Sequence, residues 1–188
     1  LVSVIVPIYM VNYTLFHYTG NCIGSVREHT PKDKYELIIV DNGSPIQPPS
    51  LNSYYANRVI KNEKNLGVTK AWNQGIRIST GGYIVLLNND VQVFDGWLED
   101  MKKALESCNL VMAHPMYSNS DPFARAVEAQ KVRSGTLRFD PIPGGKDFSC
   151  VMFRKSLVDE IGIEGKGLFN EAFFNYCSDS DLFVRMEK

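Results

Sequence analysis

The sequence contains few of the residues that build metal centres and disulfide frameworks. Four cysteines and three histidines occur among 188 residues. No Cys-x-x-Cys pair is present, and no histidine stands at ligand spacing from a cysteine, so a zinc site is not expected. The cysteine spacing is also unlike that of a secreted disulfide framework. We therefore expect reduced, buried thiols and a cytoplasmic location.

Several motifs of nucleotide binding and hydrolysis are missing as well. No Gly-x-Gly-x-x-Gly follows a hydrophobic run, which argues against a dinucleotide site. The glycine-rich stretch 162–167 does not have the spacing of a phosphate-binding P-loop. Neither Gly-x-Ser-x-Gly nor His-Glu-x-x-His occurs, so nothing indicates a serine hydrolase or a zinc protease.

Long hydrophobic runs and an excess of one charge are also absent. The longest apolar run, Leu1–Val11, is interrupted by Ser3 and Pro7 and is too short to span a bilayer. It lacks the basic start and cleavage site of a signal peptide. Twenty basic residues face 21 acidic ones, for a net charge of −1. Neither nucleic acid nor an anionic membrane is therefore expected as a partner.

What the sequence does contain is an alternation of apolar runs and amphipathic segments. Near-continuous apolar strands that alternate with helices predict an α/β three-layer sandwich around a mostly parallel sheet. We expect strands at 2–8, 36–40, 58–61, 83–87, 110–113 and 149–153. We expect helices at 14–29, 48–56, 65–79, 95–107, 122–131, 155–161 and 179–187, with Gly81 and Gly82 as the cap of the third. Residues 116–147 are expected to form surface structure.

Polar or aromatic residues follow three of the predicted strands. Tyr9 follows the first, Asp41 and Asn42 follow the second, and Asn89 and Asp90 follow the strand at 83–87. Each cluster taken alone is an ordinary turn. Ligands of open α/β sheets bind beyond the carboxyl ends of the strands, however, so clusters gathered at that edge favour a binding site.

The residue types at this edge suit a nucleotide and a cation. Asp90 offers a hard oxygen ligand to a divalent metal ion. Asp41 and Asn42 can accept hydrogen bonds from a base or a ribose, and Tyr9 can stack on a base, although an aromatic residue there is also typical of a core or its rim.

A second acidic cluster, Ser178 to Asp181, precedes the last predicted helix. One interpretation is a helix N-terminus with Ser178 as the cap and acids in the first turn. The other is a general base at the edge of a cleft. The residues alone leave both open.

Five segments together resemble family 2 glycosyltransferases, in the order in which that family carries them, over nearly the whole chain. They are Val2–Tyr9, Glu36–Ser44, Asn65–Gly67 with Ala71 and Asn73–Gly75, Gly82–Asp90, and Phe169–Arg185. The resemblance implies a GT-A fold and transfer of a sugar from a nucleotide-sugar donor with inversion at the anomeric carbon. The donor it suggests is a UDP-sugar such as UDP-glucose, or a rhamnose donor, and the acceptor is a saccharide or glycan hydroxyl.

The same resemblance implies roles for individual residues. Asp179 would be the catalytic base, and Asp90 would hold Mn²⁺ or Mg²⁺ on the diphosphate as part of a DxD-like motif. The remaining donor-site residues that it implies are Pro7, Tyr9, Asp41, Asn42, Asn65, Gly67, Asn73 and Asn89. Two departures stand out: the metal motif reads Asn88-Asn89-Asp90, with one carboxylate, and Ser178 replaces the usual glutamate.

Two other functions are compatible with the sequence. A sugar-nucleotidyltransferase shares a related scaffold, but it needs a glycine-rich basic loop after the first strand, where this chain has Tyr9–Asn12. A non-catalytic nucleotide-sugar or glycan-binding module would tolerate both departures. We expect a single domain, with residues 1–114 as the donor half and 115–188 as the acceptor half, and we expect it to be part of a longer chain.

Overall fold

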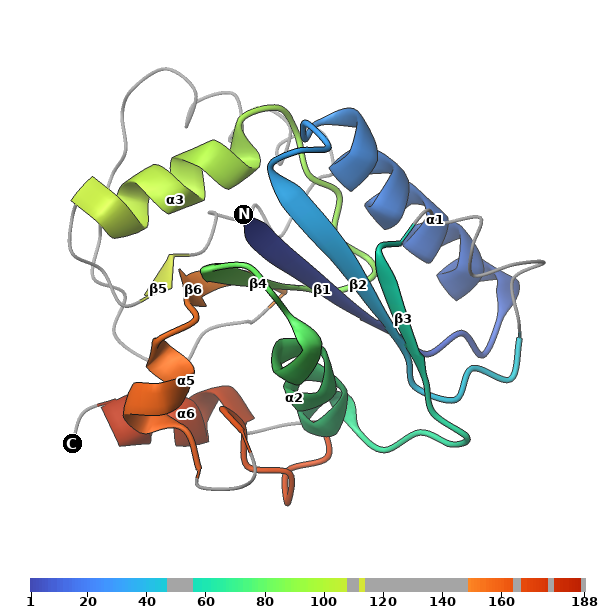
Figure 1. Cartoon of the computed structure of the whole chain (residues 1–188). Helices are drawn as coiled ribbons and strands as arrows, with labels where there is room; N and C mark the ends of the chain where they lie inside the picture. The colour runs from blue at the N-terminus through green and yellow to red at the C-terminus, as the bar shows by residue number, and fades with distance from the viewer. Residues whose placement is uncertain (47–55, 108–111, 114–148, 164–166, 176–177, 187–188) are drawn as a thin grey trace.

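The computed structural model describes residues 1–46, 56–107, 112–113, 149–163, 167–175 and 178–186. Within this part, helices cover both faces of a six-stranded sheet (Figure 1). The arrangement confirms the predicted three-layer α/β sandwich. The predicted helices at 48–56 and 122–131, and the surface structure expected at 116–147, fall almost entirely outside the described residues.

The sheet has the strand order β3-β2-β1-β4-β6-β5. Strands β1 to β4 pair in parallel, and β6 is antiparallel to both of its neighbours. Three predicted strands match the observed bounds residue for residue, and those at 36–40 and 149–153 are within one residue. The strands are β1 (Val2–Ile8), β2 (Tyr35–Asp41), β3 (Arg58–Lys61), β4 (Tyr83–Leu87), β5 (Met112–Ala113) and β6 (Cys150–Arg154).

The central strands are buried on both sides because each face of the sheet has its own layer of helices. Every residue of β2 is buried, as expected for a parallel strand between two helical layers. Helices α1 (Tyr13–Glu28) and α3 (Trp97–Ser107) pack on one face. Helices α2 (Val68–Ile78), α5 (Leu157–Ile161) and α6 (Ser178–Met186) lie on the other (Figure 1).

The strand order creates a switch point between β1 and β4. Strands β2 and β3 extend from one side of β1, and β4 lies on its other side. Ile8 pairs with Asp41, so the carboxyl ends of β1 and β2 are level at one edge. Because β6 runs the other way, its first residue, Cys150, pairs with Leu87 at the carboxyl end of β4. This edge is where open α/β sheets bind ligands.

The predicted start of α2 and its predicted glycine cap were wrong, whereas its predicted end is within one residue. The helix begins at Val68, not Asn65, because Gly67 has a φ of +89° that is not helical. It ends at Ile78, and the extended residue Ser79 caps it. Gly81 is needed instead for a close approach, since a Cβ there would lie 2.8 Å from the carbonyl oxygen of Leu1.

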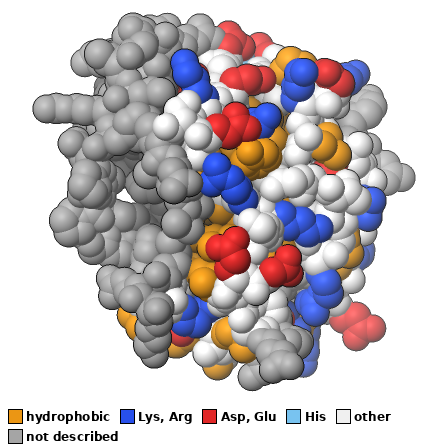
Figure 2. Space-filling view, turned by 60° about the vertical axis from the view of Figure 1, so that its left-hand side comes forward, with side chains coloured by type: hydrophobic (Ala, Val, Ile, Leu, Met, Phe, Trp, Pro, Cys, Tyr) orange, Lys and Arg blue, Asp and Glu red, His pale blue; other side chains and the backbone are white. Residues whose placement is uncertain are grey.

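The surface carries both signs of charge. On the face shown in Figure 2, Lys and Arg side chains alternate with Asp and Glu side chains around small apolar areas. No described helix is long and apolar enough to cross a membrane.

Candidate functional site

Asp41, the last residue of β2, combines complete burial with an unpaired acceptor oxygen. Its side chain is fully buried, and Oδ1 accepts a hydrogen bond from the Ser44 backbone N–H at 2.9 Å. Oδ2 is the one buried side-chain oxygen of the described residues that has no hydrogen-bond partner. An unpaired buried acceptor costs free energy, which a ligand donor would recover.

The neighbouring Asn42 has a different role, because its amide is fully engaged within the protein. Its Nδ2 donates to Asn65 Oδ1 at 2.9 Å and to the Gly67 carbonyl at 3.2 Å. Its Oδ1 accepts from Asn62 Nδ2 and from the Leu66 N–H, each at 3.0 Å. Asn42 and Asn65 thus hold the loop that leads into α2. Direct contact of Asn42, Asn65 or Gly67 with a nucleotide stays a prediction.

Asn62 and Gln74 extend this amide network into α2, and sequence reasoning missed both. Each donates its amide to the other over 2.9 Å. Asn62 also contacts Asn42, so a chain of amides joins the end of β2 to the second turn of α2. Asn62 lies outside the family-like segments and Gln74 inside one of them, but nothing in their spacing pairs them, because they come together only through the β2–β3–α2 fold.

The end of β1 contributes the aromatic side of the site. Pro7 is half-buried within the strand, and Tyr9, directly after it, is 40% exposed. The backbone N–H of Met10 donates to Ser44 Oγ at 2.9 Å. Ser44 therefore connects the turn after β1 to the turn after β2, because it also donates its N–H to Asp41. Tyr9 is thus an exposed aromatic residue at the edge of the sheet that carries Asp41.

The turn after β4 presents one carboxylate. Asn89 Nδ2 donates to Thr19 Oγ1 on α1 at 2.8 Å, and the Thr19 hydroxyl in turn donates to the Leu15 carbonyl. The Asn88 carbonyl accepts a weak hydrogen bond from the thiol of Cys22, whose pKa is raised by burial. Asp90 is exposed. Thr19 is thus a third residue, after Asn62 and Gln74, that shapes the site without a sequence signal.

This turn suits a metal ion shared with a ligand. The described residues contain no group of three or more His, Cys, Asp or Glu that could hold an ion by themselves. In phosphate-transfer sites, however, Mg²⁺ is commonly held by one or two carboxylates together with substrate phosphates. Asp90 can supply that carboxylate, and the hydrogen bond from Asn89 Nδ2 to Thr19 fixes the turn beside it.

The acidic cluster at 178–181 lies in α6. Asp179 is the second residue of this helix, and its side chain is outside the described part. Asp181 accepts from Arg185 Nε at 3.0 Å in an ion pair one turn apart. Asp181 is therefore committed to Arg185, and a catalytic role for Asp179 stays a prediction.

Asn73, the neighbour of Gln74 on α2, bonds to the segment that precedes α6. Its amide donates to the Phe169 carbonyl at 2.8 Å and accepts from the Phe169 N–H at 3.0 Å. The structure brings Pro7, Tyr9, Asp41 and Asn42 together at one edge, but it directs Asn73 to the segment that precedes α6. Nucleotide contact by Asn73 stays a prediction.

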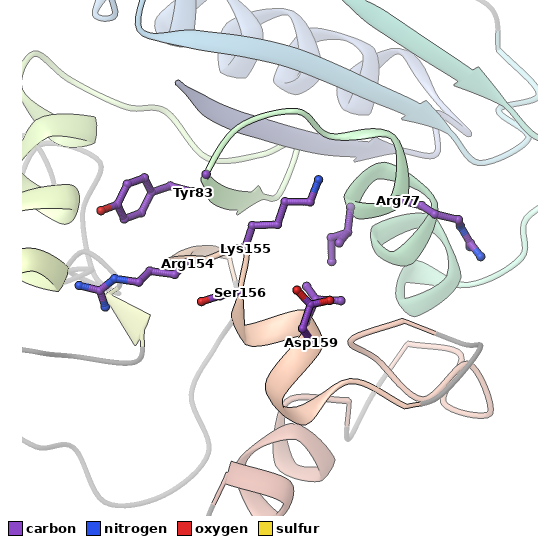
Figure 3. Close-up of a pocket in the computed structure, with 9 residues that line it drawn as sticks. Arg77, Tyr83, Arg154, Lys155, Ser156 and Asp159 are labelled. Atoms are coloured by element: carbon purple, nitrogen blue, oxygen red, sulfur yellow. The ribbon is translucent and has the colours of Figure 1, made fainter.

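A hollow of about 560 Å³ lies at the other edge of the sheet (Figure 3). Tyr83, at the start of β4, and Arg154, at the end of β6, line it. Its cations are engaged: Lys155 Nζ donates to the Ser79 carbonyl at 2.6 Å, and Arg154 donates to the Leu105 carbonyl at 2.8 Å. Arg77 points away from Lys155 in Figure 3. This hollow is therefore not the candidate site.

The chain belongs to glycosyltransferase family 2, because the model of "Glycosyl transferase family 2" matches residues 3–162. Solved structures establish the GT-A fold. The mannosyltransferase PcManGT from Pyrobaculum calidifontis, in complex with GDP-Man and Mn²⁺, has a TM-score of 0.70 and 20% identity over 98% of this chain and 51% of its own. S. aureus TarS 1–349 has a TM-score of 0.69 and 18% identity over 98% of this chain and 54% of its own.

Curated relatives named as glycosyltransferases match this chain over a limited part of their own length. An uncharacterized glycosyltransferase of Rickettsia bellii is 30% identical over 146 residues, which are 76% of this chain and 20% of that protein. Glycosyltransferase AglE of Haloferax volcanii is 32% identical over 104 residues, 52% of this chain and 33% of AglE. The chain thus spans a fifth to a third of the length of these relatives.

Proposed function

We propose that this chain is an inverting glycosyltransferase that moves a sugar from a nucleotide-sugar donor to a saccharide or glycan hydroxyl in the cytoplasm. The observation that carries the proposal is the buried, unpartnered Oδ2 of Asp41 at the carboxyl edge of a family 2 sheet. A base N–H or a ribose hydroxyl is the donor such an oxygen lacks. The S. aureus TarS structure with UDP favours a UDP-sugar, and the GDP-Man complex of PcManGT provides the alternative base.

The proposed reaction is a single in-line displacement. The acceptor oxygen attacks the anomeric carbon, the bond from that carbon to the diphosphate oxygen breaks, and the nucleoside diphosphate leaves with the bonding electrons. Asp179 takes the hydroxyl proton, which makes the acceptor a competent nucleophile. In this proposal residues 1–114 bind the donor, with Tyr9 and Pro7 beside the base, and residues 115–188 bind the acceptor.

Asp90 and the oxygens of the donor diphosphate would hold Mn²⁺ or Mg²⁺ in this proposal. When bound, such an ion stabilises the negative charge of the leaving diphosphate. The contribution of the chain is the Asn88–Asp90 turn, which Thr19 and Cys22 attach to α1.

The test compares the purified wild-type protein with Asp179→Asn. In the presence of Mn²⁺ we measure thermal stabilisation by UDP-glucose, UDP-N-acetylglucosamine, GDP-mannose and an activated rhamnose, and then nucleoside diphosphate release from the donor that stabilises most. Asp179→Asn should keep the stabilisation and lower the release rate by about 10²–10⁴-fold, the usual contribution of a general base.

The possible outcomes separate the alternatives. Full activity in Asp179→Asn would remove Asp179 as the base. Binding without release or transfer in the wild type would favour a non-catalytic module, and pyrophosphate release from a nucleoside triphosphate would favour a nucleotidyltransferase. Absence of any stabilisation would overturn nucleotide-sugar binding itself.

A further inference from the structure

One side of α2 is attached to the segment 167–174, which precedes α6. Asn73 pairs with both backbone groups of Phe169. The Thr69 hydroxyl donates to the Phe173 carbonyl, and the Val68 N–H donates to the Phe174 carbonyl at 2.8 Å. Three positions of α2 thus hold this segment through its backbone, whatever side chains the segment carries.

The two elements approach each other too closely for side chains at the contact points. A Cβ on Gly67 would lie 2.6 Å from the Phe174 carbonyl oxygen. A Cβ on Gly167 would lie 2.9 Å from Asn73 Cγ. Such contacts leave few alternative arrangements, so the segment is fixed relative to α2.

Charge adds to this attachment at Glu171. Lys70 and Arg77 of α2 lie 3.7 and 4.0 Å from its carboxylate, and Asn73 Nδ2 lies 3.3 Å from Glu171 Oε1. Asn73 therefore stands between two cations on the same side of the helix and contacts both Phe169 and Glu171.

The segment is held from α6 at the adjacent residue. Arg185 of α6 donates to the Leu168 carbonyl at 2.7 Å and to the Ile161 carbonyl at 2.6 Å. Leu168 and Phe169 are fully buried, and the Phe169 ring lies 5.0 Å from that of Trp72. Two consecutive buried residues thus connect α6, through Arg185, to α2, through Asn73.

We propose that Asn73 is a positioning residue that sets the place of α6, and with it Asp179, relative to the donor site, and that it does not contact the donor. The inference rests on the proposed function. The amide of Asn73 is occupied by Phe169, whereas the preceding loop of α2 is held by Asn42 at the end of β2. Helix α2 therefore fixes the position of α6, which contains Asp179, relative to the proposed donor-binding edge at Asp41.

Asn73→Ala removes both hydrogen bonds from α2 to the buried backbone of Phe169, so the segment 167–174, and α6 with it, is held less firmly against α2. A misplaced base slows proton transfer, and a displacement of about 1 Å can cost roughly 10²-fold in rate. The Asp41 edge keeps its own hydrogen bonds, so donor affinity should not change.

The experiment measures kcat and KM for nucleoside diphosphate release, with water as the acceptor. The probe is whichever of UDP-glucose, UDP-N-acetylglucosamine and GDP-mannose the wild type turns over fastest. The expected result is a fall in kcat of roughly 10²-fold for Asn73→Ala, with the Kd of the matching nucleoside diphosphate unchanged by calorimetry. In the Asp179→Asn background, Asn73→Ala should cause no further fall, because coupled residues are not additive.

Ile76→Val is the matched control, since Ile76 is a buried residue of α2 that serves only the core. It should lower Tm and leave kcat unchanged. If Asn73→Ala does not fold, Thr69→Val, which removes the hydrogen bond to Phe173, carries the same expectations.

The inference is overturned by a raised KM and Kd with unchanged kcat, which would place Asn73 at the donor. It is equally overturned if Asn73→Ala lowers kcat as much in the Asp179→Asn background as in the wild type. The same holds if Ile76→Val lowers kcat as much as Asn73→Ala does. A wild type that binds no nucleotide sugar overturns the proposed function itself, which is a different result from any of these.

Discussion

At the scale of the residue, the structure separates side chains that look equivalent in the sequence. Asp41 and Asn42 are adjacent members of one turn cluster, and the sequence predicts both as nucleotide contacts. The partners that occupy Asn42 are Asn62, Asn65 and the loop to Gly67, at least 20 residues away. Local pattern identifies the cluster, but only the fold shows that Asn42 is occupied and that Asp41 keeps a free oxygen.

Asp41→Asn tests that difference. The new amide oxygen can still accept from Ser44, so the Tm of the free protein should change little. The charged acceptor for the ligand is lost, and hydrogen bonds to charged groups are worth about 1.5–3 kcal/mol. The Kd of UDP or GDP, whichever binds the wild type more tightly, should rise by about 10- to 150-fold in calorimetry. An unchanged Kd would place the nucleotide elsewhere.

At the scale of the element, the local sequence predicts the bounds of those helices and strands that depend only on interactions within the segment. The bounds of β1, β3 and β4 follow from β-branched and apolar composition alone. The start of α2 and the role of Gly81 do not, because they depend on tertiary partners: Gly67 turns against Phe174, and Gly81 packs against β1. Glycine in a sequence does not show whether it caps a helix, turns a loop or admits a neighbouring backbone.

Alanine substitutions at Gly67 and Gly24 distinguish a glycine that a turn and a close contact require from a glycine that merely lies within a helix. At Gly67 a Cβ meets the Phe174 carbonyl at 2.6 Å and the φ is +89°, so Gly67→Ala should lower the free energy of unfolding by about 1–3 kcal/mol. At Gly24, inside α1, no atom lies within 4 Å of the new Cβ. Gly24→Ala should raise it by about 0.5–1 kcal/mol. Urea unfolding measures both, and equal effects would contradict the assignment.

At the scale of the whole molecule, Glu36 closes the edge of the sheet away from the site. Its Oε1 accepts from the Ser3 hydroxyl at 2.6 Å and from Thr80, and Arg58 lies 3.6 Å from Oε2. Strands β1, β2 and β3 and the approach to β4 thus meet at one carboxylate. Burial raises its pKa, but the hydrogen bonds from Ser3 and Thr80 and the charge of Arg58 outweigh burial, so the pKa lies below the ordinary value of 4.5.

This shift predicts how stability depends on pH. A folded-state pKa below the unfolded value contributes stability above the unfolded pKa, and this contribution is lost as the pH falls through the folded pKa. The free energy of unfolding should therefore decline on acidification below about pH 5. Glu36→Gln should cost about 1–3 kcal/mol at neutral pH and weaken the decline. Parallel pH profiles for the two proteins would show that Glu36 does not contribute.

The antiparallel strand β6 has a consequence for how such a protein can change. Strands β5 and β6 are neighbours, with Ala113 paired to Met152, and β5 ends at the edge where β6 begins. The chain therefore leaves β5 and enters β6 at the edge of the sheet where β4 ends. Because lengthening the connection between two paired strands costs little free energy, the connection from β5 to β6 can change in length and sequence while the sheet stays intact. The fold therefore allows this connection to vary independently of the strands that carry Asp41 and Asp90 at their ends.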